Sequence, residues 1–179
     1  MEAEIRFKKS AVLLLAAALV GTVLAAFLPY ALEPLLGLAE GLTERGIDPP
    51  DRLILLSPWV DVTMSNPEIK DYEGVDPMLT ITMGQVSGKA WSGALPTDDW
   101  HVSPINGDLS NLHNVTIFVG DRELFTPDDT LLYEKLSANE NARLIIGHGQ
   151  NHVYPVYPTL EGRIAMEQII DIINRQGEN

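Results

Sequence analysis

The chain has 179 residues, which is enough for one ordinary domain with a sizeable hydrophobic core. It carries 25 acidic and 12 basic residues, so its net charge is −13, and a surface this acidic argues against nucleic acid as a partner because it repels phosphate backbones. It contains no cysteine, which excludes disulfides, thiolate metal sites and cysteine nucleophiles.

The first feature along the chain is a run from Ser10 to Leu32 that contains no charged residue. Roughly 20 apolar residues can cross a bilayer as a helix, and basic residues precede the run while acidic residues follow it, as in an anchor with a cytoplasmic N-terminus. We therefore assign residues 1–34 to a hydrophobic N-terminal segment with a long helix, and expect a membrane contact through residues 10–32. Two alternatives remain open: a secretory signal peptide, or a buried strand and helix in a cytoplasmic protein.

The remaining segments predict an α/β domain over residues 35–179. Leu35–Arg45 has the pattern of an amphipathic helix that ends at Gly46. Short apolar runs with little polar alternation indicate buried strands of a parallel sheet, and these runs are Leu53–Leu56, Val115–Val119 and Leu144–Ile146. Further helices are expected at Thr82–Trp91, Thr126–Ser137 and Leu160–Asn174. This alternation predicts a short parallel sheet flanked by helices.

The last two helices have expected inner faces. Thr126-Pro127-Asp128-Asp129 is a strong helix start, because threonine caps, proline suits the first turn and acids face the positive end of the helix dipole. The residues expected to face the core are Leu131, Leu132 and Leu136 in the first helix, and Ile164, Ala165, Ile169, Ile172 and Ile173 in the second. Residues 58–112 form too long a stretch for a plain connection, and we expect them to contribute a lid or a pocket wall.

Polar side chains follow the predicted strands at Ser57–Asp61, Gly120–Glu123 and Gly147–His152. Function gathers beyond the carboxyl ends of parallel strands, and a carboxylate beside an imidazole is what a catalytic triad needs, because the acid orients the base and stabilises its charged form. From the residues alone, the acid is Asp121 or Glu123 and the base is His148 or His152. A metal site built from the same residues is a weaker alternative, because their spacings fit no strong ligand motif.

Five stretches form a distinctive combination, and together they span roughly Asp51 to Arg175. They are LILLSPWVDVTMSNPEIKDYE at Leu53–Glu73, DPML at Asp76–Leu79, VSPINGDLSNL at Val102–Leu112, VTIFVGDRELFTPDD at Val115–Asp129 and NHVYPVYP at Asn151–Pro158. In these stretches the chain resembles the hormone-sensitive-lipase-like, or fold-3, branch of the α/β hydrolases, which contains bacterial carboxylesterases and acetyl esterases. The resemblance implies the C-terminal part of an α/β-hydrolase fold and an ester hydrolase of short acyl or acetyl esters that needs no cofactor.

The resemblance also implies roles for single residues. Glu123 takes the position of the triad acid and His152 that of the catalytic histidine, with Asp121 and His148 as second choices. Asp128 matches an acidic position that caps the following helix. The family places Trp59 at the pocket floor, and we expect Trp59 and Tyr154 to contact the substrate, a small ester.

The nucleophile that this mechanism requires has no match in the chain. Neither a Gly-x-Ser-x-Gly turn nor a glycine-rich oxyanion loop of the His-Gly-Gly-Gly type occurs in the sequence. We therefore expect negligible esterase activity from this chain alone. A truncated or frameshifted gene, a pseudo-enzyme, and a fragment completed by another chain all fit this expectation.

A second hypothesis is a non-catalytic, membrane-anchored interaction module. It is motivated by the apolar run and by the missing serine. In either case, the three predicted strands leave an unpaired sheet edge beside the Leu53 strand, and unpaired edges recruit partners. We expect the N-terminal segment, a second copy of the chain or a complementing chain to cover that edge.

Overall fold

The structure is a computed structural model, and it describes residues 12–16, 35–137 and 142–174. Its strands are β1 (Val12–Ala16), β2 (Arg52–Leu56), β3 (Val115–Gly120) and β4 (Ala142–Gly147). Its α-helices are α1 (Leu35–Glu44), α2 (Ile81–Ser92), α3 (Thr126–Ser137) and α4 (Leu160–Asn174). Short 3-10 helices occur at Pro67–Tyr72 (η1), Pro104–Asn106 (η2) and Tyr154–Val156 (η3). The α/β class and the parallel sheet flanked by helices are confirmed.

Within the described residues, the sheet has four strands in the order β1-β2-β3-β4, and every neighbouring pair is parallel. Ile54 lies opposite Thr116, and Thr116 lies opposite Arg143, so one row of residues crosses the three strands expected from the sequence. Because all strands run the same way, their carboxyl ends meet at one edge of the sheet.

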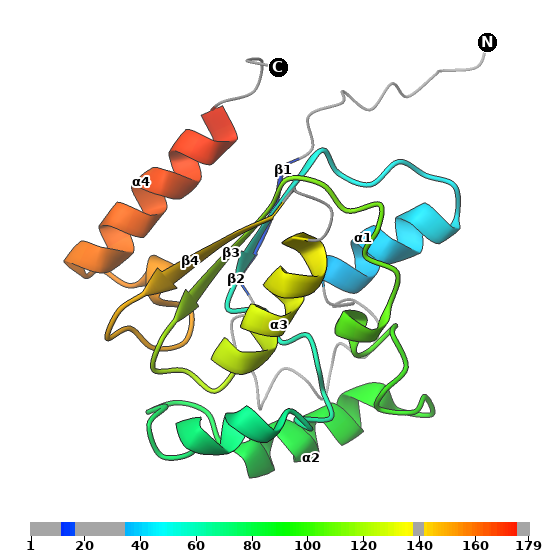
Figure 1. Cartoon of the computed structure of the whole chain (residues 1–179), viewed down its shortest axis with the longest axis horizontal. Coiled ribbons are helices and arrows are strands. Elements are labelled where there is room, and N and C mark those ends of the chain that lie inside the picture. Colours follow the sequence, from blue (N-terminus) through cyan, green and yellow to red (C-terminus); the bar gives the residue numbers. More distant parts are fainter. Residues whose placement is uncertain (1–11, 17–34, 138–141, 175–179) are drawn as a thin grey trace.

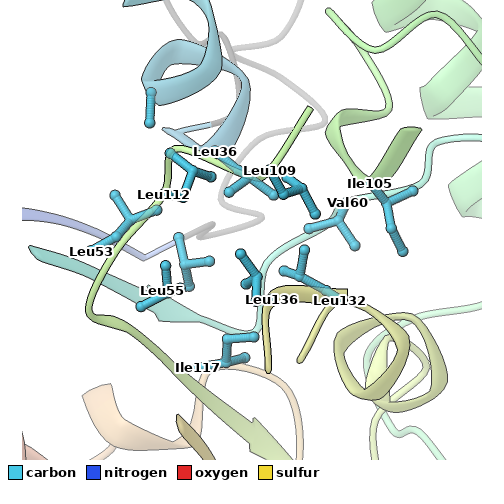
Figure 2. Close-up of a cluster of buried hydrophobic side chains, with 12 residues drawn as sticks. Leu36, Leu53, Leu55, Val60, Ile105, Leu109, Leu112, Ile117, Leu132 and Leu136 are labelled. Carbon is cyan, nitrogen blue, oxygen red and sulfur yellow. The ribbon is translucent and has the colours of Figure 1, made fainter. Parts of the chain in front are cut away.

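The two faces of the sheet carry separate cores, because successive strand residues point to opposite sides. Leu53 and Leu55 pack with residues of α1 and α3 on one face (Figure 2). Ile54 and Leu56 pack with residues of α4 on the other. Figure 1 shows the sheet between α4 on one side and α1 and α3 on the other. A strand covered on both faces needs apolar residues at every position, which explains the unbroken LILL run.

The expectation of a continuous helix from Ser10 to Leu32 is wrong at its start, where Val12–Ala16 form β1. β1 pairs in parallel with β2, so it occupies the edge beside the Leu53 strand that the sequence left unpaired. A buried parallel strand and a membrane helix both read as uncharged apolar runs, so hydropathy alone did not separate them. Residues 10, 11 and 17–32 of the run lie outside the described residues. In the part of the chain that the structure describes, no helix is long and apolar enough to cross a membrane.

The expected helix faces are correct in part. Leu132, Leu136, Ala165 and Ile169 are buried, but Leu131 is 39% exposed and Ile164 is 48% exposed. Each exposed residue directly precedes a buried one, and one step along an α-helix turns a side chain by about a quarter of the circumference. The sequence therefore predicts the correct helices, but the buried face of each helix is narrower than expected.

Residues 58–112 contribute α2, which lies across the region beneath the sheet in Figure 1. Gly88 permits this position, because a Cβ there would lie 2.3 Å from the carbonyl oxygen of Val62. Gly84 faces Met64 in the same way, with a Cβ only 2.9 Å from the methionine side chain. Two glycines one turn apart thus let α2 pack closely against the chain that leaves β2.

Glu40 is a buried carboxyl in α1. It is 4% exposed, and neither carboxyl oxygen has a hydrogen-bond partner among the described residues. Burial first, then the nearby acids Asp108 and Glu44, raise the pKa of Glu40 from 4.5 to about 8. The side chain is therefore mostly protonated at neutral pH.

This burial predicts a pH-dependent stability. Folding raises the pKa of the Glu40 carboxyl, so the group destabilises the folded state progressively as the pH rises from about 4.5 to about 8, and no further above that. Glu40→Gln removes the titration. Its unfolding free energy relative to that of the unsubstituted protein should rise by roughly 2 to 4 kcal/mol between pH 4 and pH 9, as measured by guanidinium unfolding at a series of pH values.

Glu134→Gln, on the exposed surface of α3, is the matched control for this series. Its unfolding free energy should stay within about 0.5 kcal/mol of that of the unsubstituted protein, because substitutions at exposed positions have small effects. Parallel curves for Glu40→Gln and the unsubstituted protein would show that Glu40 does not titrate in this range.

Candidate active site

The loop between β3 and α3 carries a buried carboxylate, Glu123. Glu123 is 0% exposed, and its Oε2 accepts hydrogen bonds from Ser57 Oγ at 2.8 Å and from the backbone N–H of Gly120 at 3.0 Å. Its Oε1 has no hydrogen-bond partner among the described residues. Two donors therefore hold one carboxylate oxygen and leave the other available.

The free oxygen of Glu123 faces the imidazole of His152. His152 Nδ1 lies 3.6 Å from Oε1, and His152 is 1% exposed. This distance is slightly longer than a hydrogen bond, and catalytic hydrogen bonds are often long before a substrate binds. The structure thus brings Glu123 and His152 together. His152 Nε2 is buried and has no hydrogen-bond partner among the described residues.

Backbone hydrogen bonds join the loops that carry Glu123 and His152. The N–H of Asp121 donates to the carbonyl of Gly147 at 3.0 Å, and the N–H of Arg122 donates to the carbonyl of Gln150 at 3.0 Å. Gly120 permits this approach, because a Cβ there would lie 2.2 Å from the carbonyl oxygen of Gln150. The short distance between the acid and the histidine therefore follows from direct contact between the two loops.

Asp76 fixes the acid loop from the other side. Its Oδ2 accepts from the backbone N–H of Leu124 at 2.8 Å, and its Oδ1 accepts from the N–H groups of Met78 and Leu79 at 2.7 and 3.0 Å. Asp76 is 6% exposed. A buried carboxylate with three backbone donors is a stable support, so residues 76–79 are tied to the residue after Glu123.

Two further carboxyls lie in the first turn of α3. Burial raises the pKa of Asp128 to about 6, although a hydrogen bond from Asn66 Nδ2 at 2.9 Å opposes the effect. Asp128 thus accepts a hydrogen bond from Asn66, the residue before η1. Among the described residues, no hydrogen bond from the backbone of α3 to the Asp128 side chain accompanies it. Burial, then Glu123 and Asp128, raise the pKa of Asp129 well above its ordinary value. Burial therefore disfavours the charged form of Asp129 beside Glu123.

The second-choice residues form a separate pair at the surface. His148 Nδ1 lies 3.1 Å from Asp121 Oδ2, and the two side chains are 88% and 37% exposed. The backbone N–H of Gly149 donates to the other oxygen of Asp121 at 2.6 Å, which gives this aspartate a structural role in the turn. Among the described residues, no group of three or more potential ligands could hold a metal ion.

An aromatic array leads from His152 to a small pocket. The ring of Phe125 meets the His152 ring edge-on at a centroid distance of 5.3 Å, and it stacks on Trp59 at 6.0 Å. Trp59 and Phe125 line this pocket together with Leu79, Met83 and Leu124. The pocket wall expected from residues 58–112 is therefore provided in part by α2.

Tyr154 lies elsewhere. It is 3% exposed and packs in the cluster beneath α4 with Ile54, Leu56 and Phe118. Burial, followed by the charge of Glu123, raises the pKa of its hydroxyl to about 12. A substrate contact by Tyr154 stays a prediction.

Local sequence patterns indicate no role for three residues that shape this site: Ser57, Asp76 and Phe125. Ser57 directly follows a predicted strand, which was the available signal, but its bond to Glu123 depends on backbone geometry. Asp76 and Phe125 lie within the stretches that carried the family resemblance. The bond of Asp76 to Leu124 joins residues 48 positions apart, and the bond of Ser57 to Glu123 joins residues 66 positions apart. Local sequence patterns do not encode contacts between such distant segments.

Comparison with known proteins supports the geometry. The family profile described as alpha/beta hydrolase fold matches residues 35–156. An esterase-like protein from Staphylococcus aureus superposes with a TM-score of 0.75 and 28% identity, over 79% of this chain and 49% of that one. The HSL homologue EstE7 from a metagenome library gives a TM-score of 0.72 and 26% identity, over 77% and 50% of the two chains.

A hormone-sensitive lipase from a metagenome library gives the same values, with a TM-score of 0.72, 26% identity and coverages of 77% and 50%. The chain therefore spans about half the length of the solved structures that it matches. Among curated proteins, no relative matches the chain.

The contact between the two loops predicts a large effect of Gly120→Ala. The new Cβ would meet a backbone oxygen of residue 150 at 2.2 Å, and backbone cannot yield as a flexible side chain can. We expect the free energy of unfolding to fall by about 2 kcal/mol, as measured by guanidinium unfolding.

Gly41→Ala in α1 is the matched control, because nothing lies within 4 Å of the position where its Cβ would stand. It should stabilise the protein by up to about 1 kcal/mol, through helix propensity. Equal stabilities of Gly120→Ala and the unsubstituted protein would contradict the close approach of the loops.

Proposed function

This chain belongs to the hormone-sensitive-lipase-like, fold-3 family of α/β hydrolases, and from that premise we propose that it carries the acid and the base of a carboxylic-ester hydrolase. Glu123 is the acid and His152 is the base that relays protons for a serine nucleophile. The proposal adds that the 179-residue chain alone has negligible activity, because its sequence contains no Gly-x-Ser-x-Gly turn.

The buried Glu123–His152 pair is the observation that carries this proposal. The acid lies against Nδ1 of the ring, and Nε2 is the nitrogen left for the nucleophile, which is the division of labour in a catalytic triad. Burial strengthens the interaction, because a charge pair is screened less in the interior than at the surface. The exposed His148–Asp121 pair lacks this property and is the weaker candidate.

The pocket beside the pair suits an acyl group. It is lined by Trp59, Leu79, Met83, Leu124 and Phe125, and Phe125 also contacts the His152 ring. This lining is largely apolar, as an acyl chain requires. Short-chain acyl or acetyl esters, which the family resemblance implies, are the proposed substrates of a completed site.

A nucleophile restored upstream should reveal the activity. Supplying a His-Gly-Gly-Gly loop and a Gly-x-Ser-x-Gly segment before residue 35 should give hydrolysis of p-nitrophenyl acetate or butyrate, whereas the unmodified chain should give none and should not react with a fluorophosphonate probe. In the active hybrid, His152→Ala should lower kcat on the order of a millionfold, and Glu123→Gln about ten-thousandfold.

The surface pair supplies the control for this hybrid. His148→Ala alters the same residue type at the exposed pair, and it should leave kcat within about twofold of the parent hybrid, because the His148 side chain is 88% exposed. A folded hybrid that hydrolyses no ester, or one whose activity depends on His148 and not on His152, would overturn the proposed function.

A further inference from the structure

The hydroxyl of Ser57 joins the loops at the carboxyl ends of β2, β3 and β4. Ser57 directly follows β2 and is 0% exposed. Its Oγ donates to Glu123 Oε2 at 2.8 Å and accepts from the backbone N–H of Val153 at 2.9 Å. Its own backbone N–H donates to the carbonyl of Phe118 in β3 at 2.7 Å. One small residue therefore contacts both the acid and the residue that follows the histidine.

The backbone at both ends of the Ser57–Val153 bond is unusual. Ser57 has a φ of 48° and Val153 has a φ of 53°, both in the left-handed region. This conformation is uncommon for any residue with a side chain, and it is an outlier for a β-branched one. Such conformations persist only where the surroundings hold them in place. The hydroxyl is one such restraint, and it acts on the residue next to His152.

The same hydroxyl limits the rotation of the Glu123 carboxylate. The backbone N–H of Gly120 also donates to Oε2, but it belongs to the same short loop as Glu123. Ser57 adds a donor from a different strand, 66 residues away in sequence. Two donors from separate elements hold Oε2, and Oε1 lies 3.6 Å from His152 Nδ1.

We infer that Ser57 is a positioning residue, whose hydroxyl turns Oε1 of Glu123 toward the imidazole and fixes the backbone that presents His152. The inference rests on the proposed function, because it assigns a role within the same acid–base pair. Ser57 acts through its hydrogen bonds to Glu123 and Val153. Its effect should therefore appear in the tautomer of the His152 ring.

Nuclear magnetic resonance of the full chain, labelled with ¹⁵N-histidine, tests this inference. The chain has four histidines, so their ring nitrogens can be resolved and assigned by substitution. In the unsubstituted protein, His152 should carry its proton on Nδ1, facing Glu123. Ser57→Ala and Ser57→Gly both remove the hydroxyl, and in both the His152 nitrogens should shift toward a mixture of the two tautomers. Glycine also relieves the left-handed backbone, so it preserves the fold better.

Three outcomes separate the possibilities. A change at His152 in both Ser57 variants and in Glu123→Gln, with the signal of His148 unmoved, supports the inference. A change in Glu123→Gln with none in Ser57→Gly overturns the role of Ser57 and leaves the acid–base pair intact. An unchanged His152 signal in Glu123→Gln would show that Glu123 does not interact with the His152 ring, and it would contradict the proposed function as well.

Discussion

The site depends on one constraint, which is the contact between the loops that follow β3 and β4. Parallel strands deliver their carboxyl ends to one edge, but they do not by themselves bring two side chains within reach. The additional closeness comes from Gly120, which lets the carbonyl of Gln150 approach where a side chain would stand. Glu123 and His152 are neighbours because the backbones beneath them touch.

Three carboxyl groups lie close together in sequence in the loop before α3 and in its first turn. Glu123, Asp128 and Asp129 lie within seven residues of one another in a protein whose net charge is −13. Burial raises the pKa of both aspartates, so they are protonated more readily than exposed acids. Glu123 receives two donors on one oxygen instead. The number of donors therefore distinguishes these carboxyls: Glu123 accepts two hydrogen bonds on one oxygen, Asp128 accepts one from Asn66, and no donor to Asp129 is found among the described residues.

Much of this arrangement was predictable from the sequence, because strong local signals specify it. The LILL and VTIFV runs predicted β2 and β3 within one residue of their ends, and α4 was predicted with its observed bounds. Val12–Ala16 was assigned to a helix because an apolar run does not reveal whether its hydrogen bonds are local or made to β2. The bonds of Ser57 and Asp76 join distant segments, so no local pattern indicates them.

A crystal structure of the full chain would test the central claim most directly, through the relative positions of the Glu123 carboxylate and the His152 ring. We expect Oε1 to lie within about hydrogen-bonding reach of Nδ1, with Ser57 Oγ bonded to Oε2. Side chains that lie far apart, or a ring turned toward the surface with His148 in its place, would contradict it.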